Sequence, residues 1–149
     1  MLVNKVLNVT MEEMDAFIKD MVVQDIYHAT GKKIKVNDIK PGYKYHKKLK
    51  ARSGKEGKVT THIDQLSSGD YKASFSSAQG LNKLSYHYEG NKDGKITLNY
   101  EENYDANSKS QALNYQLMNF LYKHSNKRRI NLMLTHIEEL IQQNRKPVA

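Results

Sequence analysis

The stretch Tyr71–Gly90, with the sequence YKASFSSAQGLNKLSYHYEG, decides the fold of this chain. In each half a large apolar residue alternates with a polar one, and a turn near Gly80 separates the halves. The alternating apolar residues are Tyr71, Ala73 and Phe75 in the first half, and Leu84, Tyr86 and Tyr88 in the second. A period of two predicts strands with one buried face, and the short connection allows only a hairpin. The stretch therefore predicts an antiparallel sheet.

The same alternation continues on both sides of this hairpin. The further sets are Tyr43 and Tyr45, then Val59, Thr61 and Ile63, and finally Ile96, Leu98 and Tyr100. Turn residues separate these sets, and residues 2–9 predict one more strand ahead of them. Polar residues such as His62, Lys72 and Glu101 take the opposite parity, which indicates one buried and one wet face. We expect a curved antiparallel sheet of about six strands, whose buried face must be covered.

A helix is predicted to follow the first strand. Thr10-Met-Glu-Glu13 has the form of a capping box, in which the threonine hydroxyl and the glutamate carboxylate satisfy free N–H groups. Gly31 suits the end of this helix, because glycine adopts a positive φ without penalty. The apolar stripe of the helix drifts after Met21, which predicts a bend or two short helices.

The cover of the sheet is predicted in a helical segment at about 108–146. Two apolar stripes occur there at helical spacing. They are Leu113, Leu117, Phe120 and Leu121, and then Ile130, Met133, Leu134, Ile137, Leu140 and Ile141. At about 100° per residue the stripes are roughly 200° out of phase, so one straight helix cannot bury both. We expect two helices with a break near His124–Asn126, and Arg145 and Lys146 at the negative end of the second.

Length and composition favour one α+β domain spanning residues 1–149. A chain of 149 residues can bury a core without cross-links. Cysteine is absent, which excludes disulfides and thiolate metal sites and fits a reducing compartment. Polar residues interrupt the N-terminal segment, so it does not have the form of a signal peptide, and no run is long enough to span a bilayer. We expect a cytoplasmic protein without membrane insertion, whose oligomeric state the sequence does not predict.

The chain is basic, with a formal net charge of +8 and a pI near 9.5. Such a balance favours anionic partners, namely nucleic acid or an acidic protein. The candidate basic surface consists of Lys44, Lys47, Lys48, Lys50 and Arg52, together with Lys127, Arg128 and Arg129. The plainer interpretation is a solvated surface that keeps the protein soluble.

No motif for catalysis, a metal or a cofactor is recognised. We expect no metal and no cofactor, and we favour a non-catalytic protein over an enzyme, which stays open as an alternative. Adjacent carboxylates such as Glu101-Glu102 point apart on a strand and cannot flank one bond together. The histidines lack metal-ligand spacing; His62 and His87 share the predicted wet face and could be neighbours, but a chance pair is the simpler interpretation. Gly54-Lys-Glu-Gly57 lacks the full spacing of a phosphate loop and is interpreted as a hairpin turn.

The order of strand, helix, loop, five strands and helices resembles the helix-grip fold of the START-like or Bet v 1-like superfamily. In that fold a curved antiparallel sheet wraps a C-terminal helix and leaves a cavity between them. Three groups of residues also resemble a family of small bacterial proteins designated DUF3284, over essentially the whole chain. They are Ala29-Thr-Gly-Lys-Lys33, the strand Tyr43-Lys-Tyr45, and Lys127-Arg-Arg129 followed by Met133 and Ile137-Glu138.

This resemblance implies a START-like fold and a cytoplasmic bacterial protein. Genes of such relatives look to be encoded beside genes for β-glucoside uptake and phospho-β-glucosidases, which implies a link to carbohydrate metabolism. The family has no established catalytic residues, so none is carried over to this chain.

Tyrosine is common, with 10 residues, and gathers on the predicted inner parity of the sheet. A cavity lined by phenols would be amphipathic, because each ring is apolar and each hydroxyl needs a hydrogen-bond partner. The candidate cavity residues are Tyr43, Tyr45, Tyr71, Phe75, Tyr86, Tyr88 and Tyr100 on the sheet, with Leu117, Phe120 and Leu121 on the helical cover. The alternative is an ordinary core whose hydroxyls reach the rim of the sheet, because tyrosine is also a favoured strand residue.

Three functions remain open at this point. The first is non-catalytic binding of a small amphipathic or sugar-like molecule in the cavity. The second is an interaction module that uses the basic surface on nucleic acid or an acidic protein. The third and weakest is an enzyme of the cyclase or hydrolase kind, which would need a titratable group on an inner face that is predicted to hold phenols almost exclusively.

Overall fold

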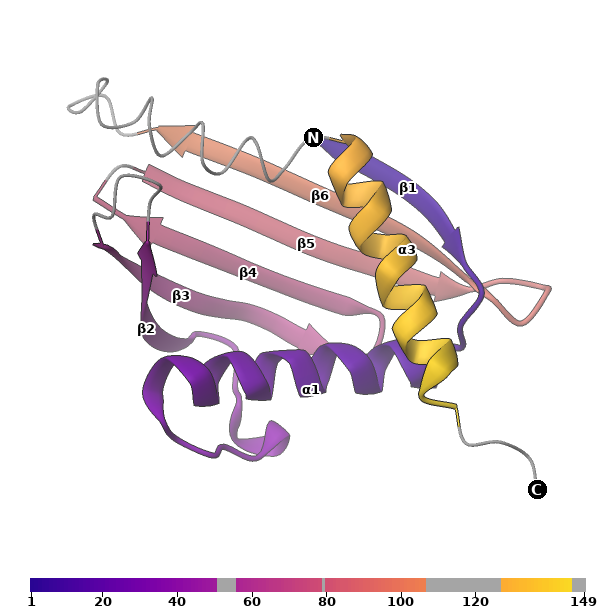
Figure 1. Cartoon of the computed structure of the whole chain (residues 1–149), viewed down its shortest axis with the longest axis horizontal. Coiled ribbons are helices and arrows are strands. Elements are labelled where there is room, and N and C mark those ends of the chain that lie inside the picture. The colour runs from indigo at the N-terminus through magenta and orange to yellow at the C-terminus, as the bar shows by residue number, and fades with distance from the viewer. Residues whose placement is uncertain (51–55, 79, 107–126, 146–149) are drawn as a thin grey trace.

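A computed structural model describes residues 1–50, 56–78, 80–106 and 127–145. Six strands form one antiparallel sheet, and helices lie on one side of it (Figure 1). In chain order the elements are β1 (Leu2–Leu7), α1 (Met11–Thr30), the 3₁₀ turn η1 (Val36–Asp38), β2 (Tyr43–Lys50), β3 (Glu56–Ser67), β4 (Asp70–Ser77), β5 (Gly80–Gly90), β6 (Ile96–Ala106) and α3 (Lys127–Gln143). The predicted α+β class and the curved sheet of six strands are confirmed.

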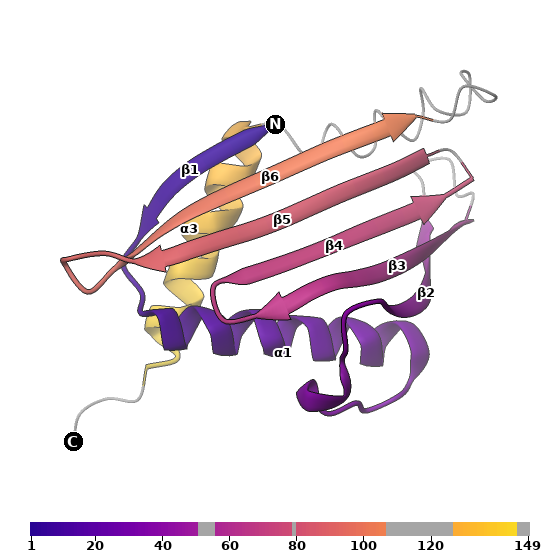
Figure 2. The same ribbon diagram turned by 180° about the vertical axis from the view of Figure 1, so that it is seen from behind.

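The strands lie in the order β1-β6-β5-β4-β3-β2, and every neighbouring pair is antiparallel. The first strand of the chain therefore completes the sheet beside the last, and β1 and β2 are its two edges. Tyr71, Tyr86 and Tyr100 are direct partners across β4, β5 and β6, so their side chains share one face. We call this the inner face, because α3 lies over it, and Figure 2 shows the opposite, outer face from behind.

A bulge interrupts the alternation of β3 between Ile63 and Gln65. Ile63 opposes Ala73 and Leu66 opposes Tyr71, so Asp64 is the extra residue of β3 at this point. An extra residue shifts the parity of a strand, which brings Leu66 to the inner face although its even number predicts the outer one.

Helix α1 has the predicted capping box at its start. The Glu13 N–H donates to Thr10 Oγ1 at 3.1 Å, and the Thr10 N–H donates to Glu13 Oε1 at 2.9 Å. Gly31 ends the helix with φ at 75°, as predicted. The expected bend is wrong, because one helix runs from Met11 to Thr30. Its buried residues are Met14, Ile18, Val22 and Ile26; a spacing of four drifts by only about 40° per step, which one continuous helix accommodates against the sheet.

Helix α3 crosses the inner face beside β1 (Figure 1). Its buried residues are Ile130, Leu134, Ile137 and Ile141, all members of the second predicted C-terminal stripe. With Val3 and Leu7 of β1 they belong to one apolar core, and each such side chain stabilises the fold by roughly 1.5–3 kcal/mol on burial. The first predicted C-terminal helix and the break near His124–Asn126 lie outside the described residues.

Arg145, just beyond α3, ties this helix to the start of α1. Its Nε donates to Glu13 Oε2 at 2.7 Å, and its second terminal nitrogen donates to Glu13 Oε1 at 2.9 Å and to the Asn8 carbonyl at 3.1 Å. From α3 itself, Glu138 accepts a hydrogen bond from the Asn8 N–H, and Gln142 donates one to the Asn8 carbonyl. These hydrogen bonds therefore hold the connection between β1 and α1 against the C-terminal end of α3. Lys146 lies outside the described residues.

Neither described helix combines the length and the apolar composition that a membrane span requires.

Candidate functional site

The sheet residues predicted to line a cavity are mostly buried in the described structure. Five phenols are 2–5 % exposed, namely Tyr45, Tyr71, Tyr86, Tyr88 and Tyr100. Tyr43 and Phe75 are half-buried and pack against the same core. Leu117, Phe120 and Leu121 lie outside the described residues.

Three of these phenols form a row across the centre of the inner face. The rings of Tyr71 and Tyr86 are stacked, with centroids 5.8 Å apart and planes 13° apart. Tyr86 meets Tyr100 edge to face, with centroids 5.1 Å apart and planes 88° apart. Both arrangements suit the quadrupoles of aromatic rings, so the row is a well-packed apolar wall with hydroxyls at its edge.

One end of the row meets an ion pair between helix and sheet. The Tyr45 hydroxyl on β2 donates a hydrogen bond to Asp25 on α1, and Lys47 Nζ lies 3.2 Å from the same carboxylate. The Lys47 ammonium also lies 5.4 Å from the centroid of the Phe75 ring, within cation–π range. Lys47 is thus directed inward, although the sequence placed it on a basic surface.

The other end of the row meets a second carboxylate, which sequence reasoning missed. Tyr100 Oη donates to Glu102 Oε2 at 2.7 Å, and Asn82 Nδ2 donates to Glu102 Oε1 at 3.0 Å. Glu102 follows Tyr100 by two residues on β6, so their side chains point to the same face. The alternation in the sequence therefore already indicated a carboxylate on the inner face. Asn82 directly opposes Phe75 across β4 and β5.

These residues form three groups on the inner side of the sheet. Tyr45 and Lys47 meet at Asp25, the rings of Tyr71, Tyr86 and Tyr100 form the row, and Tyr100 and Asn82 meet at Glu102. Phe75 opposes Asn82 and lies beneath the Lys47 ammonium. We call the whole set the inner-face cluster; its members are Asp25, Tyr45, Lys47, Tyr71, Phe75, Asn82, Tyr86, Tyr100 and Glu102. It combines aromatic faces with one cation, two carboxylates and an amide.

Two buried polar atoms within this region have unused hydrogen-bonding capacity. Thr61, the partner of both Tyr45 and Phe75 across the sheet, is fully buried, and its Oγ1 makes no hydrogen bond of normal geometry in the described chain. Asn82 is 8 % exposed, and its Oδ1 is likewise without a partner there. A buried polar atom without a partner costs about 1–3 kcal/mol, so each calls for a physical reason.

The surroundings keep the phenols of the cluster in their neutral form. Burial raises the pKa of Tyr71 and Tyr86 above the usual value of 10, and nearby charge adds to this. Burial also raises the pKa of Tyr45 and Tyr100, with further contributions from their carboxylate partners Asp25 and Glu102. At neutral pH these hydroxyls are therefore hydrogen-bond donors rather than bases.

Tyr88, which the sequence grouped with the cavity residues, has a different environment. Its hydroxyl donates to Asp15 on the first half of α1, which also accepts hydrogen bonds from Ser68 and the Gly69 N–H. Asp15 precedes Asp25 by ten residues, or about 15 Å along the helix. Gly69 has φ at 80°, and a Cβ there would lie 2.8 Å from the Tyr88 carbonyl oxygen, so this end of the sheet is closely packed.

The predicted basic residues do not gather on one surface. Lys44 and Lys48 are exposed on β2, whereas Lys47 is half-buried against Asp25. The other group, Lys127, Arg128 and Arg129, is exposed at the start of α3, which packs on β1 at the opposite edge of the sheet (Figure 1). The side chains of Lys50 and Arg52 lie outside the described residues.

No group of three histidine or carboxylate side chains that could hold a metal occurs in the part of the chain that the structure describes. His62 and His87 lie on β3 and β5 with β4 between them, so they are not neighbours. His87 instead contacts Asp70 at 2.7 Å and Glu89 at 3.2 Å.

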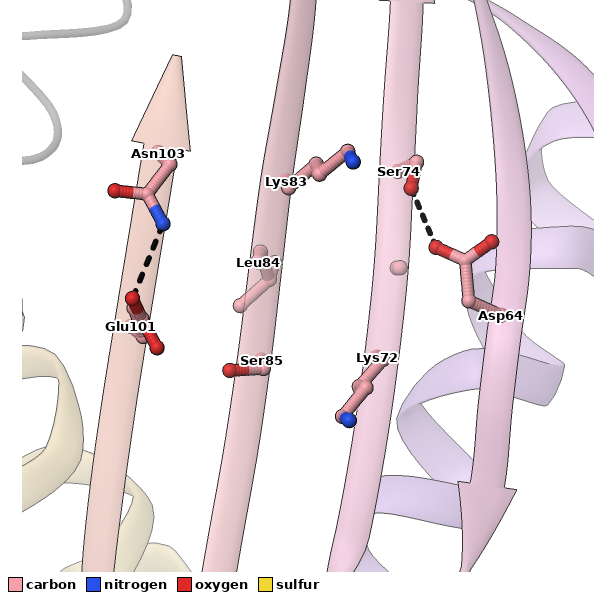
Figure 3. A pocket seen from close by; sticks show the side chains of 9 residues that line it. Asp64, Lys72, Ser74, Lys83, Leu84, Ser85, Glu101 and Asn103 are labelled. Carbon is pink, nitrogen blue, oxygen red and sulfur yellow. Dashed lines mark hydrogen bonds between the residues drawn. The ribbon is translucent and has the colours of Figure 1, made fainter.

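A shallow hollow of about 360 Å³ occupies the outer face of the sheet (Figure 3). The short side chains of Ser74 and Ser85 form the bottom of this hollow, and longer side chains surround them. Two lysines and two acids line it, so its formal charges balance, and Ser74 and Asn103 donate hydrogen bonds to the acids. The helices lie behind the sheet in this view, so the hollow is separate from the inner-face cluster.

A larger hollow of about 630 Å³ opens where the last turns of α1 approach β2 and β3. It is lined by Asp25, His28, Ala29, His46, Lys47, Lys48 and Lys58. Two of these residues, Asp25 and Lys47, are also members of the inner-face cluster. We call this hollow the mouth, because it opens to the surface beside these two residues.

The fold and the buried inner face place the protein in the Bet v 1-like, helix-grip class. Ara h 8.0201 is similar over 97 % of each chain with a TM-score of 0.62 and 11 % sequence identity. An uncharacterised protein from Rhizobium leguminosarum matches with a TM-score of 0.57 and 9 % identity, over 97 % of this chain and 94 % of its own. SA2116 from Staphylococcus aureus, of unknown function, matches with a TM-score of 0.57 and 16 % identity, over 96 % of this chain and 93 % of its own.

The chain belongs to the family described as Domain of unknown function (DUF3284), whose sequence profile matches residues 1–123. The resemblance predicted from the sequence is thereby confirmed. The matched range includes Ala29–Lys33 and Tyr43–Tyr45 but ends before Lys127–Arg129, so the C-terminal part of that resemblance lies beyond it. No curated protein matches the chain.

Proposed function

We propose that this protein binds a small amphipathic molecule against the inner-face cluster, without catalysing a reaction. The observation that carries this proposal is a pair of buried oxygens beside a wall of aromatic rings, Thr61 Oγ1 and Asn82 Oδ1, which lack a hydrogen bond of normal geometry among the described residues. Two ligand hydroxyls, one donating to Asn82 Oδ1 and the other to Thr61 Oγ1, would remove the cost of leaving these oxygens unpaired.

The chemistry of the cluster favours a ligand with both a ring and hydroxyl groups. The Tyr71–Tyr86–Tyr100 row offers aromatic surface on which a sugar face or an aromatic ring can pack. The carboxylates of Asp25 and Glu102 and the amide of Asn82 offer directional hydrogen bonds at its two ends. A purely apolar ligand would leave the polar groups unpaired, and glucose alone would cover less of the ring surface than a glucoside that carries an aromatic group.

The likeness to Ara h 8.0201 supports a fold that can enclose a ligand between sheet and helices, at 11 % identity, and it says nothing of which ligand. We further propose a β-glucoside or related molecule, a role as a sensor or carrier in carbohydrate metabolism, and a cytoplasmic location in one START-like domain. These finer points rest on the family resemblance and on the absence of cysteine.

Isothermal titration with a matched set of probes tests this proposal. We expect phenyl β-glucoside to bind with a dissociation constant of about a millimolar or tighter, and both phenol and glucose to bind more weakly. Asn82→Ala is expected to weaken binding of the glucoside, whereas Asn99→Ala, on the exposed outer face of β6, serves as the matched control. Failure of every probe to bind at millimolar concentration would overturn the proposal.

One observation favours the enzyme hypothesis, and another argues against it. The inner face carries Asp25, Lys47 and Glu102 and so is not purely phenolic, contrary to the sequence-based expectation. Each of these groups, however, is already engaged by a neighbour, as Lys47 is by Asp25 and Glu102 is by Tyr100 and Asn82. A charged group that already holds an ion pair or hydrogen bonds in this way is less available as an acid or base, so binding is the function we favour.

The interaction-module hypothesis receives less support. Because Lys44 and Lys48 lie at one edge of the sheet and Lys127–Arg129 pack beside the other, the described basic residues offer no single stripe for a nucleic acid backbone. Steep salt dependence of binding to generic RNA or DNA would favour it over ligand binding.

A further inference from the structure

Strand β1 has an open edge among the described strands, because it pairs there with β6 alone. The Met1 amino group donates to the Glu102 carbonyl at 2.8 Å, and the Glu102 N–H donates to the Met1 carbonyl at 2.9 Å. In an antiparallel pair such mutual hydrogen bonds recur at every second residue, so the odd-numbered residues of β1 bond to β6. The N–H and C=O groups of Leu2, Asn4 and Val6 therefore point away from β6, at the open edge.

The next position of this series, Asn8, lies just beyond β1 and is covered by the C-terminal end of α3. Its N–H donates to Glu138, and its carbonyl accepts hydrogen bonds from Gln142 and Arg145. The three outward-pointing residues within β1 have no such side-chain partner in the part of the chain that the structure describes. Proteins usually protect an edge strand by covering it or by placing charges on it. The cover on β1 is thus confined to its last position.

The outer side of β1 also lacks protecting charges. Leu2 and Val6 are 51 % and 54 % exposed there, one on either side of Asn4. The opposite edge of the sheet, β2, instead exposes Lys44 and Lys48. Lysines on an edge strand oppose pairing with another chain, whereas exposed apolar side chains favour it. In Figures 1 and 2 the open edge of β1 lies at the outline of the molecule, and α3 lies over the inner face rather than beyond this edge.

The outer side of β1 has the same pattern in both directions, apolar, amide and apolar. A two-fold axis at Asn4 would place Asn4 opposite its own copy and Leu2 opposite Val6 of the second copy. These residues are the ones whose backbone groups face the open edge, so each pairing would make mutual hydrogen bonds. On the inner side Lys5 would oppose Val3 of the second copy, so no like charges would face each other directly.

From these observations we propose that the protein forms a symmetric dimer through β1, in which the two sheets join into one. The occupant of the open edge is a second copy of this chain, because a two-fold contact requires a surface that is complementary to itself, and Leu2, Asn4 and Val6 meet this requirement. An extended segment of another protein could use the same backbone groups, but the outer side of β1 offers no charge that would select its sequence. The dimer leaves the inner-face cluster unchanged, so it is independent of the proposed ligand.

The expected dimer is weak and reversible. A single pair of strands with its flanking side chains falls at the low end of interface sizes, below about 1,200 Å². We therefore expect a dissociation constant of about 10–100 µM. Sedimentation velocity of the full chain should show monomer well below this concentration and dimer well above it.

A single introduced cysteine tests the position of the axis, because the chain contains no cysteine of its own. Mutually hydrogen-bonded residues of an antiparallel pair have Cα atoms about 5.5 Å apart, a distance that a disulfide spans. Asn4→Cys should therefore form a disulfide-linked dimer under mild oxidation. Asn99→Cys is the matched control: Asn99 opposes Asn4 on β6 and is also exposed, but its copy would lie three strand spacings away, or about 14 Å.

A mixing experiment tests the register of the two strands. Leu2→Cys and Val6→Cys should each stay reduced when oxidised alone, because each lies four residues, or about 14 Å, from its own copy along the strand pair. The two variants together should form a mixed disulfide, because Leu2 opposes Val6 across the axis.

Val6→Lys places a charge at the open edge and should weaken the dimer by about tenfold or more. Leu132→Lys is its control, because Leu132 is a leucine on α3 that is 62 % exposed, so the same charge should leave the dissociation constant unchanged. Circular dichroism checks that both variants are folded.

A chain that remains monomeric at millimolar concentration would overturn the proposal. Equal crosslinking of Asn4→Cys and Asn99→Cys would overturn it as well, since collisions rather than a fixed interface would then form the disulfides. A dimer that Val6→Lys leaves intact would place the interface elsewhere and contradict pairing through β1.

Discussion

The Tyr45 phenol on β2 donates a hydrogen bond to the Asp25 carboxylate on α1, and this contact joins an edge strand to the helix that runs past it. Strand β2 pairs with only one neighbour in the sheet, β3. Its other support comes from α1, through Tyr45 and through Lys47, which binds the same carboxylate. The contact therefore holds both the edge of the sheet and the wall shared by the mouth and the inner-face cluster.

Tyr45→Phe should destabilise the fold by about 1 kcal/mol, because it removes one buried hydrogen bond while Asp25 keeps Lys47 and partial solvent contact. Urea unfolding followed by circular dichroism measures this difference. Tyr43→Phe is the matched control: Tyr43 is half-buried on the same strand, its ring 6.3 Å from that of Tyr45, and its loss of a hydroxyl should cost close to nothing. Equal effects of the two variants would contradict the role given to the Asp25 contact.

Arg145→Gln should lower the melting temperature at neutral pH by a few degrees at most, since the pair with Glu13 is partly exposed. The hydrogen bond from Arg145, together with the hydrogen bonds of Thr10, lowers the pKa of Glu13 from 4.5 to about 2. A carboxylate with a lowered pKa stabilises the fold above its unfolded pKa, and this stability is lost as the pH falls. The difference between the wild type and the variant should therefore be constant above pH 4.5 and vanish between pH 4.5 and about 2.

Arg128→Gln supplies the control for that measurement, because Arg128 is exposed in the first turn of α3 and loses the same charge. A cation at a helix N-terminus is unfavourable, so this variant should match the wild type or slightly exceed it. A pH-independent loss of stability in Arg145→Gln would show that the contact with the Asn8 carbonyl, rather than the ion pair, is what matters.

The buried phenols should ionise at higher pH in the folded protein than in the unfolded chain. Burial raises the pKa of Tyr45, Tyr71, Tyr86, Tyr88 and Tyr100, which make up half of the ten tyrosines. A raised pKa means that the stability contributed by these neutral phenols is complete below the unfolded value of 10 and falls as the pH rises above it. Phenolate absorbance should then rise in two steps, the second coinciding with alkaline unfolding.

The double variant Tyr71→Phe/Tyr86→Phe should reduce the amplitude of the second step and leave the first unchanged. A single step near pH 10, complete before the circular dichroism signal is lost, would contradict the burial of the row.

The sequence predicted the strands well because the parity of a pleated strand is a local property. The row of Tyr71, Tyr86 and Tyr100 follows from that parity together with hairpin connections. The same alternation places Lys47 and Glu102 on the inner face. Long charged side chains usually lie at the surface, so the sequence alone did not predict these two residues there.

Other features could not be read from local pattern. Asp25 reaches Tyr45 only because α1 packs at one particular angle and depth against β2, which is decided by the whole core. The bulge at Asp64 changes the parity of Leu66 without any glycine or proline to mark it. The bend expected in α1 was wrong because the drift of an apolar stripe does not distinguish a kink from a continuous helix whose contacts rotate around it.

Thr61→Val tests the central claim most directly, because it replaces with a methyl group of similar shape a buried hydroxyl that lacks a hydrogen bond of normal geometry among the described residues. If Thr61 is kept for a ligand, the variant should be more stable than the wild type by about 1 kcal/mol and should bind phenyl β-glucoside more weakly. Thr97→Val, on the exposed outer face, is the control and should change neither quantity. Parallel urea unfolding and calorimetric titration should therefore give opposite signs for Thr61→Val. A variant that is less stable, or that binds the glucoside as tightly as the wild type, would contradict ligand binding at the inner-face cluster.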